Sequence, residues 1–307
     1  RRKHPDVHFY SPEGAQGYLI EQIREIVSSI SLAPVRAQGK VYILDRVDLL
    51  GTSAANAFLK TLEEPAPDIT FILLGRTREA VLPTIVSRCQ VVPFRHIPSS
   101  EAAGILSQKT GVTAQQARIA IEACNGSITR AMVFAKSAER SEFRARVMEV
   151  LSNLELSDPR DVLEYAAELI ERSKAPLDNV RTQQSEELAE SADFLTKSAL
   201  KQIELRHKRT LTMATKESLG QMTSIIRSWL RDVLMIVSGT PDLVINVDQK
   251  EALERAAQRV SYAGIMSALR EAYRTDEALS YNVSPETCLD ALLFSIREVL
   301  HGSGNPH

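Results

Sequence analysis

Three segments within the first hundred residues carry side chains that could do chemistry. The first is the apolar run Val41–Leu44, which ends at Asp45. In phosphate-loop ATPases an acid at the end of such a strand orients Mg²⁺ beside the phosphates. An aspartate that follows a strand is also a common turn residue. This run alone therefore leaves both magnesium binding and a simple turn open.

The second segment runs from Leu82 to Gln90 and contains Ser87, Arg88 and Cys89. Pro83 suits the first turn of a short helix, and Arg88 falls at the end of that helix. A guanidinium there can stabilise the helix C-terminus. It can instead reach across a subunit boundary to a phosphate, because a planar cation with five N–H donors suits a transferring phosphoryl group. Spacing alone favours the helix-end role.

The third segment is a predicted amphipathic helix at about 53–64, which Pro65 ends. Thr52 or Ser53 can cap its start. Its apolar residues share one face, and these are Ala54, Ala55, Phe58, Leu59 and Leu62. The opposite side carries Asn56, Lys60 and Glu64 at a spacing of four residues.

Short apolar runs and helical patterns alternate through this region, as expected for a parallel α/β sheet buried on both faces. The predicted strands are Val7–Tyr10, Val41–Leu44, Thr70–Leu74 and Val91–Phe94. The predicted helices lie at about 17–31, 53–64 and 79–88. The sheet would therefore place the three segments on one α/β domain.

After Pro98 the strand pattern disappears and helical patterns follow to the end of the chain. Three short helices are predicted, from Ser99 to Gly111, from Ala114 to Cys124 and from about Ser127 to Ala138. Beyond 140, apolar residues recur at helical spacing. The charged stretch 178–213 predicts either a long solvated helix or a mobile connection.

The composition excludes several classes of protein. A content of 44% hydrophobic and 25% charged residues is typical of a soluble globular protein, and no apolar stretch approaches the roughly 18 residues of a membrane span. The three cysteines, Cys89, Cys124 and Cys288, lie far apart, so neither a disulfide framework nor a zinc site is indicated. A net charge of −2 argues against strong autonomous nucleic-acid binding. We expect a reducing cytoplasm.

In order and spacing, three segments of the chain resemble the clamp-loader AAA+ family, which includes the bacterial gamma/tau and delta-prime subunits and the eukaryotic replication-factor-C subunits. These segments are Val41–Asp45, Ala55–Pro65 and Thr84–Gln90. The helix of the Asn-Ala-Leu-Leu-Lys-Thr-Leu-Glu-Glu-Pro type and the Ser-Arg-Cys motif are highly specific together. The resemblance is strong over the first 95 residues. In the helical remainder it is weaker, and rests on Trp229–Asp232 and Asn282–Pro285.

The sequence departs from active members of that family at several positions. Arg46 stands where they have the glutamate that polarises the attacking water. Gly75 and Arg76 fall at the sensor-1 position, and Thr129 takes the place of the sensor-2 arginine, with Arg130 displaced by one. The phosphate-cradling Gly-x-x-x-x-Gly-Lys-Ser/Thr loop does not occur in the sequence. These losses beside an intact Ser-Arg-Cys motif are typical of an arginine donor.

The resemblance implies an α/β AAA+ module with a parallel sheet over residues 1–97, a three-helix lid over 98–140 and an all-α collar for oligomerisation over 141–307. Because the sequence begins at Arg1 and not at Met, we expect the module to lack its N-terminal P-loop part. Either the remaining strands close the sheet, or residues upstream complete it. His4-Pro5-Asp6 is similar to the segment after the family's zinc module, so a zinc module upstream of Arg1 is a further expectation.

The implied function is that of a non-catalytic delta-prime-type subunit of the DNA polymerase III holoenzyme's clamp loader in DNA replication. Arg88, with Ser87 and Cys89 of its motif, would be a trans arginine finger for a neighbouring ATPase subunit. Asp45 would be a degenerate Walker-B residue. No cofactor is expected in this chain, since ATP and Mg²⁺ would lie in the neighbour.

The implied partners are the gamma/tau and delta subunits, the sliding clamp and, through the assembled complex, primer-template DNA. No membrane is involved. Two alternatives stay open at this point. One is a competent gamma/tau-like ATPase subunit, and the other is a structural helical protein whose α/β part makes no catalytic contribution.

Overall fold

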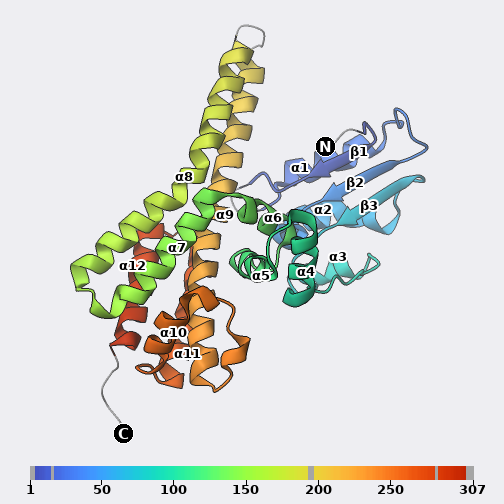
Figure 1. The fold of residues 1–307 in the computed structure, drawn as a ribbon. Helices are drawn as coiled ribbons and strands as arrows, with labels where there is room; N and C mark the ends of the chain where they lie inside the picture. Colours follow the sequence, from blue (N-terminus) through green and yellow to red (C-terminus); the bar gives the residue numbers. More distant parts are fainter. Residues whose placement is uncertain (1–3, 15–16, 193–196, 281–282, 302–307) are drawn as a thin grey trace. The chain divides into compact units, whose positions relative to one another are not determined.

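The computed structural model describes residues 4–14, 17–192, 197–280 and 283–301 (Figure 1). The chain divides into two compact units, unit 1 (residues 1–95) and unit 2 (residues 96–307). Unit 1 holds the strands, and unit 2 is helical.

Unit 1 contains a parallel sheet of three strands in the order β1-β2-β3. The strands are β1 (Val7–Tyr10), β2 (Lys40–Leu44) and β3 (Ile69–Leu73). Its helices are α1 (Ile20–Ile30), the 3₁₀ turn η1 (Val47–Leu49), α2 (Thr52–Glu63) and α3 (Pro83–Val86). Three predicted strands and the helices at 17–31 and 53–64 are thus confirmed, while the helix predicted over 79–88 is shorter.

The core of unit 1 lies between the sheet and helices α1 and α2. Tyr42 of β2, Ile23 and Ile26 of α1, and Phe58 of α2 are each 0% exposed and belong to one apolar cluster. Phe58 packs edge-on against Phe71 of β3, with ring centroids 5.2 Å apart. These contacts fix the orientation of α2, and hence the position of its last residue.

The fourth predicted strand, Val91–Phe94, is wrong. Residues 90–98 form neither strand nor helix, and Val92 and Phe94 are 65% and 92% exposed. A strand exists through hydrogen bonds to a neighbour. Within the described residues, β3 pairs only with β2 and offers its other edge to no strand. The remaining strands therefore do not close the sheet.

Unit 2 consists of helices that share one apolar core. They are α4 (Ser99–Thr110), α5 (Ala114–Ala123), α6 (Ile128–Lys136), α7 (Ala138–Asn153), η2 (Leu154–Leu156), α8 (Pro159–Ala192), α9 (Lys197–Val237), η3 (Pro241–Leu243), η4 (Val247–Gln249), α10 (Lys250–Ala257), α11 (Tyr262–Ser280) and α12 (Pro285–Leu300). A single cluster of buried residues runs from Ala102 to Leu300. The three short predicted helices correspond to α4, α5 and α6.

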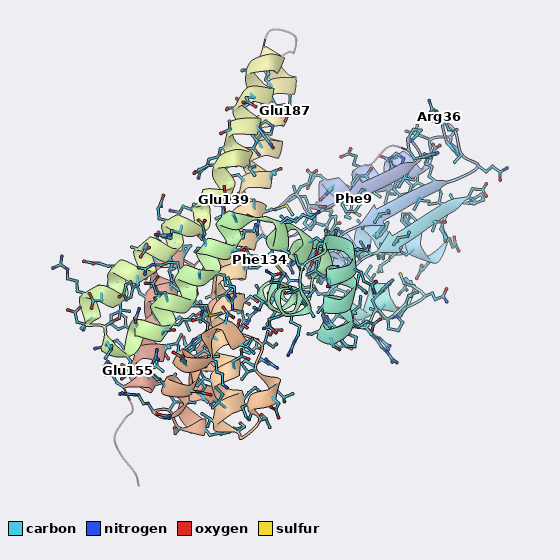
Figure 2. The ribbon with its side chains drawn as sticks, viewed as in Figure 1. Phe9, Arg36, Phe134, Glu139, Glu155 and Glu187 are labelled. Carbon is cyan, nitrogen blue, oxygen red and sulfur yellow. The ribbon has the colours of Figure 1, made fainter. Side chains whose placement is uncertain are left out.

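Helices α8 and α9 run side by side as a long antiparallel pair (Figure 1). The charged stretch 178–213 lies in this pair, except for residues 193–196, which are outside the described residues. Glu187, labelled in Figure 2, accepts a hydrogen bond from the ring of His207 across the pair, with Nε2 2.9 Å from Oε2. Among the described residues, none of the helices is both long and apolar enough to cross a bilayer.

Candidate functional site

Arg88 is fixed at the surface of unit 1 by the short helix before it. Helix α3 starts with Pro83, and Ile85, at 2% exposed, anchors it in the core. The backbone N–H of Arg88 donates to the carbonyl of Ile85 at 3.1 Å. The Arg88 side chain is 30% exposed. A locally ordered turn thus presents a guanidinium to solvent.

Every nitrogen of that guanidinium has a partner within unit 1. Nε donates to Oε1 of Glu63 at 2.6 Å, and Nη2 donates to the same oxygen. Nη1 donates to the carbonyl of Thr84 at 3.0 Å and to Oγ of Ser87 at 3.2 Å. Glu63 is the last residue of α2 and is 48% exposed. The side chain of Arg88 is therefore held in a defined orientation by an ion pair at the surface of unit 1.

Ser87 and Cys89, on either side of Arg88, lie in different surroundings. Ser87 Oγ donates to the carbonyl of Thr84 at 3.2 Å while it accepts from Arg88. Cys89 is half-buried against the unit 1 core, and this burial raises the pKa of its thiol. A raised pKa leaves the thiol protonated at neutral pH and a poor nucleophile. Ser87 therefore helps to hold Arg88, whereas Cys89 packs against the core and is poorly suited to covalent chemistry.

Asp45 lies at the carboxyl end of β2, as predicted. Its backbone N–H donates to the carbonyl of Tyr10 at 2.9 Å, and its own carbonyl accepts from the hydroxyl of Tyr18 at 2.6 Å. Burial raises the pKa of that Tyr18 hydroxyl. Within the described residues, the Asp45 carboxylate has no hydrogen bond or ion pair. Asp45 and Arg88 are not brought together by any described contact.

Arg46 adopts the left-handed conformation with φ of 55°. Its Nε lies 3.4 Å from Oδ2 of Asp48, whose side chain is 6% exposed. The other oxygen of Asp48 is buried with no hydrogen-bond partner. At the position where the resemblance leads us to expect a catalytic glutamate in active members, unit 1 thus holds a cation turned toward Asp48, and Arg46 itself cannot act as a general base.

Helix α2 has the two faces that the sequence predicted. Ala54, Ala55, Phe58 and Leu62 are buried and Leu59 is half-buried, whereas Asn56, Lys60 and Glu64 are exposed. The sequence did not reveal that Glu63 would hold Arg88, 25 residues later. No short-range spacing signals such a pair, because α2 and α3 meet only in the folded unit.

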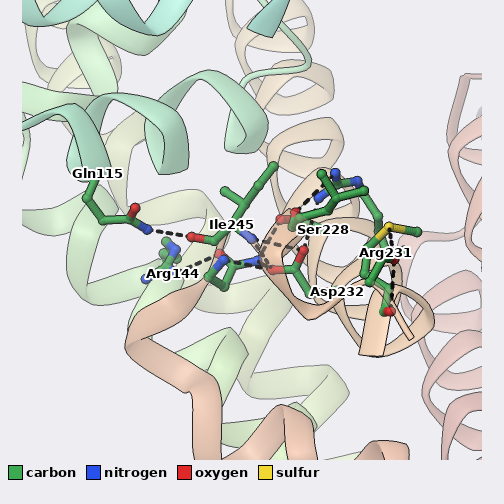
Figure 3. Close-up of polar contacts among 10 residues, drawn as sticks. Gln115, Arg144, Ser228, Arg231, Asp232 and Ile245 are labelled. Carbon is green, nitrogen blue, oxygen red and sulfur yellow. Dashed lines mark hydrogen bonds and ion pairs between the residues drawn. The ribbon is translucent and has the colours of Figure 1, made fainter. Parts of the chain in front are cut away.

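The Trp229–Asp232 motif has a structural role in unit 2 (Figure 3). Trp229 is 0% exposed in the core. Asp232, also 0% exposed, accepts hydrogen bonds from the backbone N–H groups of Ile245 at 3.1 Å and Asn246 at 2.7 Å. Arg231 Nη1 lies 3.0 Å from the same carboxylate. The carboxylate thus ties the turn after α9 back onto that helix.

Two further helices join this polar cluster. Arg144 of α7 donates to Oδ1 of Asn246 at 2.7 Å and to Oδ2 of Asp248 at 2.8 Å. Gln115 of α5 donates to the carbonyl of Ile245 at 2.5 Å (Figure 3). Helices α5, α7 and α9 are therefore joined through one turn, which holds the short N-terminal helices of unit 2 to its larger bundle.

Comparisons with known proteins match both ends of the chain. Residues 1–98 match the family described as "DNA polymerase III, delta subunit", and residues 185–298 match "DNA polymerase III, delta subunit, C terminal". The chain is 30% identical over 147 residues to DNA polymerase III subunit delta' of Bacillus subtilis (strain 168), a match covering 48% of this chain and 44% of that protein. Two segments of this chain thus match DNA polymerase III delta-subunit families, and the proteins it is similar to include delta-prime subunits.

Other matches to known proteins are shorter. DNA polymerase III subunit tau of Bacillus subtilis (strain 168) is 39% identical over 89 residues, 29% of this chain and 16% of that protein. The chain thus spans less than half the length of these relatives. The structural match to a solved gamma-subunit-related protein of Thermotoga maritima covers 96% of this chain and 84% of that protein's chain. The sequence identity is 18%, and the TM-score is 0.46. A likeness of that size carries no conclusion.

Proposed function

We propose that this chain is a non-catalytic delta-prime-type subunit of a DNA polymerase III clamp loader, acting in DNA replication in the cytoplasm. In this proposal its partners are gamma/tau and delta subunits, the sliding clamp and, through the complex, primer-template DNA. Arg88 is donated in trans to the ATP and Mg²⁺ held by a neighbouring subunit. The single observation that carries the proposal is the exposed, oriented guanidinium of Arg88 after α3.

The chemistry of a guanidinium fits this role. It stays charged at all relevant pH values and presents flat N–H donors that match phosphate oxygens. In the best-studied nucleotide hydrolases, an arginine supplied in trans accelerates hydrolysis by roughly 10³ to 10⁵-fold. Arg88 already lies at the surface on an anchored turn, so little side-chain ordering remains when a partner's phosphate approaches.

The residues of this chain do not fit a nucleotide site of its own. Asp45 is at the expected strand end, but Arg46 stands beside it with its guanidinium on Asp48. The sequence has no glycine-rich phosphate loop. Within the described residues, no three His, Cys, Asp or Glu side chains gather to hold a cation. Arg46 at this position supports the arginine-donor role of the chain.

The fold supports the assembly half of the proposal. We infer that unit 1 is the AAA+ α/β part, that α4–α6 form the lid, and that the helices from α7 onward form the collar that assembles the loader. The continuous apolar core from Ala102 to Leu300 gives the lid and collar a common framework. Such a framework suits a subunit that acts through rigid contacts with its neighbours.

A second candidate is a gamma/tau-like ATPase subunit. The 39% identity to a tau subunit over 89 residues favours it. This candidate needs a phosphate loop in the natural protein and a general base other than Arg46. Measurable ATP turnover by the isolated full-length subunit would establish it in place of the arginine-donor role.

The decisive experiment uses a reconstituted loader that contains the full-length subunit with or without Arg88→Ala. We expect DNA- and clamp-stimulated ATP turnover to fall at least tenfold, while gel filtration shows an intact complex. Arg24→Ala, which removes an exposed arginine of α1, is the matched control and should leave turnover unchanged. Unchanged turnover in an intact Arg88→Ala complex would reduce Arg88 to a helix-end cation.

A further inference from the structure

The ion pair between Glu63 and Arg88 joins two elements of unit 1 that are distant in sequence. Glu63 ends α2, and Arg88 follows α3. Oε1 of Glu63 accepts from both Nε and Nη2, whereas no described residue donates to Oε2 of Glu63. Helices α2 and α3 pack together. The carboxylate thus covers one edge of the guanidinium from a fixed position.

The position of Glu63 is not explained by its own helix. A carboxylate at a helix C-terminus lies at the negative end of the helix dipole, where it is disfavoured. The positive charge of Arg88 offsets this cost. Because both side chains are partly exposed, at 48% and 30%, their pairing adds little to the stability of the fold. Its small contribution to the stability of the fold leaves room for a functional role of the pair.

The N–H groups of Arg88 are largely occupied, so a phosphate that binds this side chain has to replace existing acceptors. A guanidinium has five N–H donors on three nitrogens. Glu63 takes Nε and Nη2, and Thr84 and Ser87 share Nη1. A phosphate that binds two parallel N–H groups must displace at least one of these acceptors. Glu63, the charged acceptor, is the one that a phosphate resembles.

We propose that Glu63 is the resting partner of Arg88: its carboxylate holds the guanidinium until a phosphate in the neighbouring ATP site takes its place. This inference rests on the trans role of Arg88 proposed above. Since an exposed ion pair is weak, the exchange is readily reversible. Glu63 is thus a positioning residue that competes with the nucleotide for Arg88 and lowers turnover when the phosphate is poorly placed.

The test measures kcat and KM for ATP of the reconstituted loader carrying Glu63→Gln. The amide keeps the size of the side chain but loses its charge, so the guanidinium is released more easily. We expect kcat/KM to rise about two- to fivefold, with most of the change in KM. Glu64→Gln, the neighbouring exposed glutamate, is the matched control and should change neither constant. The rise should vanish when Arg88→Ala is also present.

A readout on the isolated full-length chain tests the pair itself. In the unaltered chain and in Glu64→Gln, the Nε–H of Arg88 should exchange slowly with water and give a distinct NMR signal. In Glu63→Gln this signal should broaden or exchange faster. An equally slow exchange in Glu63→Gln would contradict the pairing.

The outcomes separate this inference from the function on which it rests. If Arg88→Ala is silent in an intact loader, both fail. If Arg88→Ala lowers turnover but Glu63→Gln has no effect, lowers kcat/KM, or has the same effect without Arg88, only the resting-partner role of Glu63 is overturned.

Discussion

Asp6 shows how one carboxylate can order a loop that has no secondary structure. It is 1% exposed and accepts hydrogen bonds from the backbone N–H groups of Val35 at 2.6 Å, Arg36 at 2.8 Å and Ala37 at 2.8 Å. Arg36, labelled in Figure 2, extends its own side chain into solvent from this loop. The loop between α1 and β2 is thus held to the start of β1 by three backbone N–H groups that donate to one carboxylate.

This arrangement predicts a pH dependence in the acid range. The hydrogen bond from Val35 is the largest cause that lowers the pKa of Asp6 to about 2; burial opposes the shift, and Ala37, Arg36 and His4 add to it. Because the folded pKa is below the unfolded value of about 3.9, the stabilisation is complete above about pH 4 and is lost as the pH falls through 2. The protection of the Val35 and Ala37 amide hydrogens, measured as their exchange rate relative to that of an unstructured chain at the same pH, should decrease over this range.

Asp6→Asn should abolish the protection of those amides already at neutral pH and lower the stability of unit 1. Glu21→Gln, an exposed carboxylate in the first turn of α1, is the control. Amides of 35–37 that stay protected in Asp6→Asn would show that the loop is held by other contacts.

At the same scale, the sequence predicted the positions of several residues better than it predicted their partners. Asp45, Ser87, Arg88 and Cys89 lie where their spacing placed them, at the ends of β2 and α3. The carboxylate that pairs with Arg88 was not foreseen. Motifs are local in sequence, whereas ion pairs between elements depend on how those elements pack.

Helices and buried strands were largely predictable because the spacing of their apolar residues repeats along the sequence. Val147 and Leu151 of α7, and Leu292 and Ile296 of α12, show helical spacing in the sequence and are at most 1% exposed in the structure. Val91–Phe94 failed for the opposite reason. Its apolar run is typical of a strand, but strand formation requires a backbone partner that these residues lack within the described structure.

The turn held by Asp232 gives a prediction at the scale of elements. Asp232→Ala would leave the buried N–H groups of Ile245 and Asn246 without acceptors and Arg231 without its ion pair. We expect a loss of about 3 kcal/mol in the free energy of unfolding of unit 2. Urea denaturation followed by far-UV circular dichroism measures this loss. Asp242→Ala, at an exposed position in η3 of the same turn, should change stability by less than about 0.5 kcal/mol.

At the scale of the whole molecule, the two units differ in secondary structure, because among the described residues only unit 1 contains a sheet. Unit 2 has one continuous core, whereas unit 1 has a sheet edge at β3 without a described partner and exposes Val92 and Phe94. Open sheet edges and exposed apolar chains favour association. The two units should therefore behave differently when they are separated.

We expect the fragment 96–307 to fold alone, with a cooperative thermal transition by circular dichroism. The fragment 1–95 should associate as its concentration rises, as measured by analytical ultracentrifugation. An unfolded 96–307 fragment would show that the core of unit 2 depends on unit 1. A stable monomeric 1–95 fragment would show that the open edge of β3 does not cause association.

The buried Trp229 makes the chain its own spectroscopic probe. It is the sole tryptophan in the sequence and lies in the core of unit 2. Its emission spectrum reports the loss of that core and is silent about unit 1. Near-ultraviolet circular dichroism, in contrast, also senses the aromatic cluster around Tyr42 of unit 1. Denaturation curves from the two signals coincide only if both units unfold in one step, so their separation measures the independence of the units without any label.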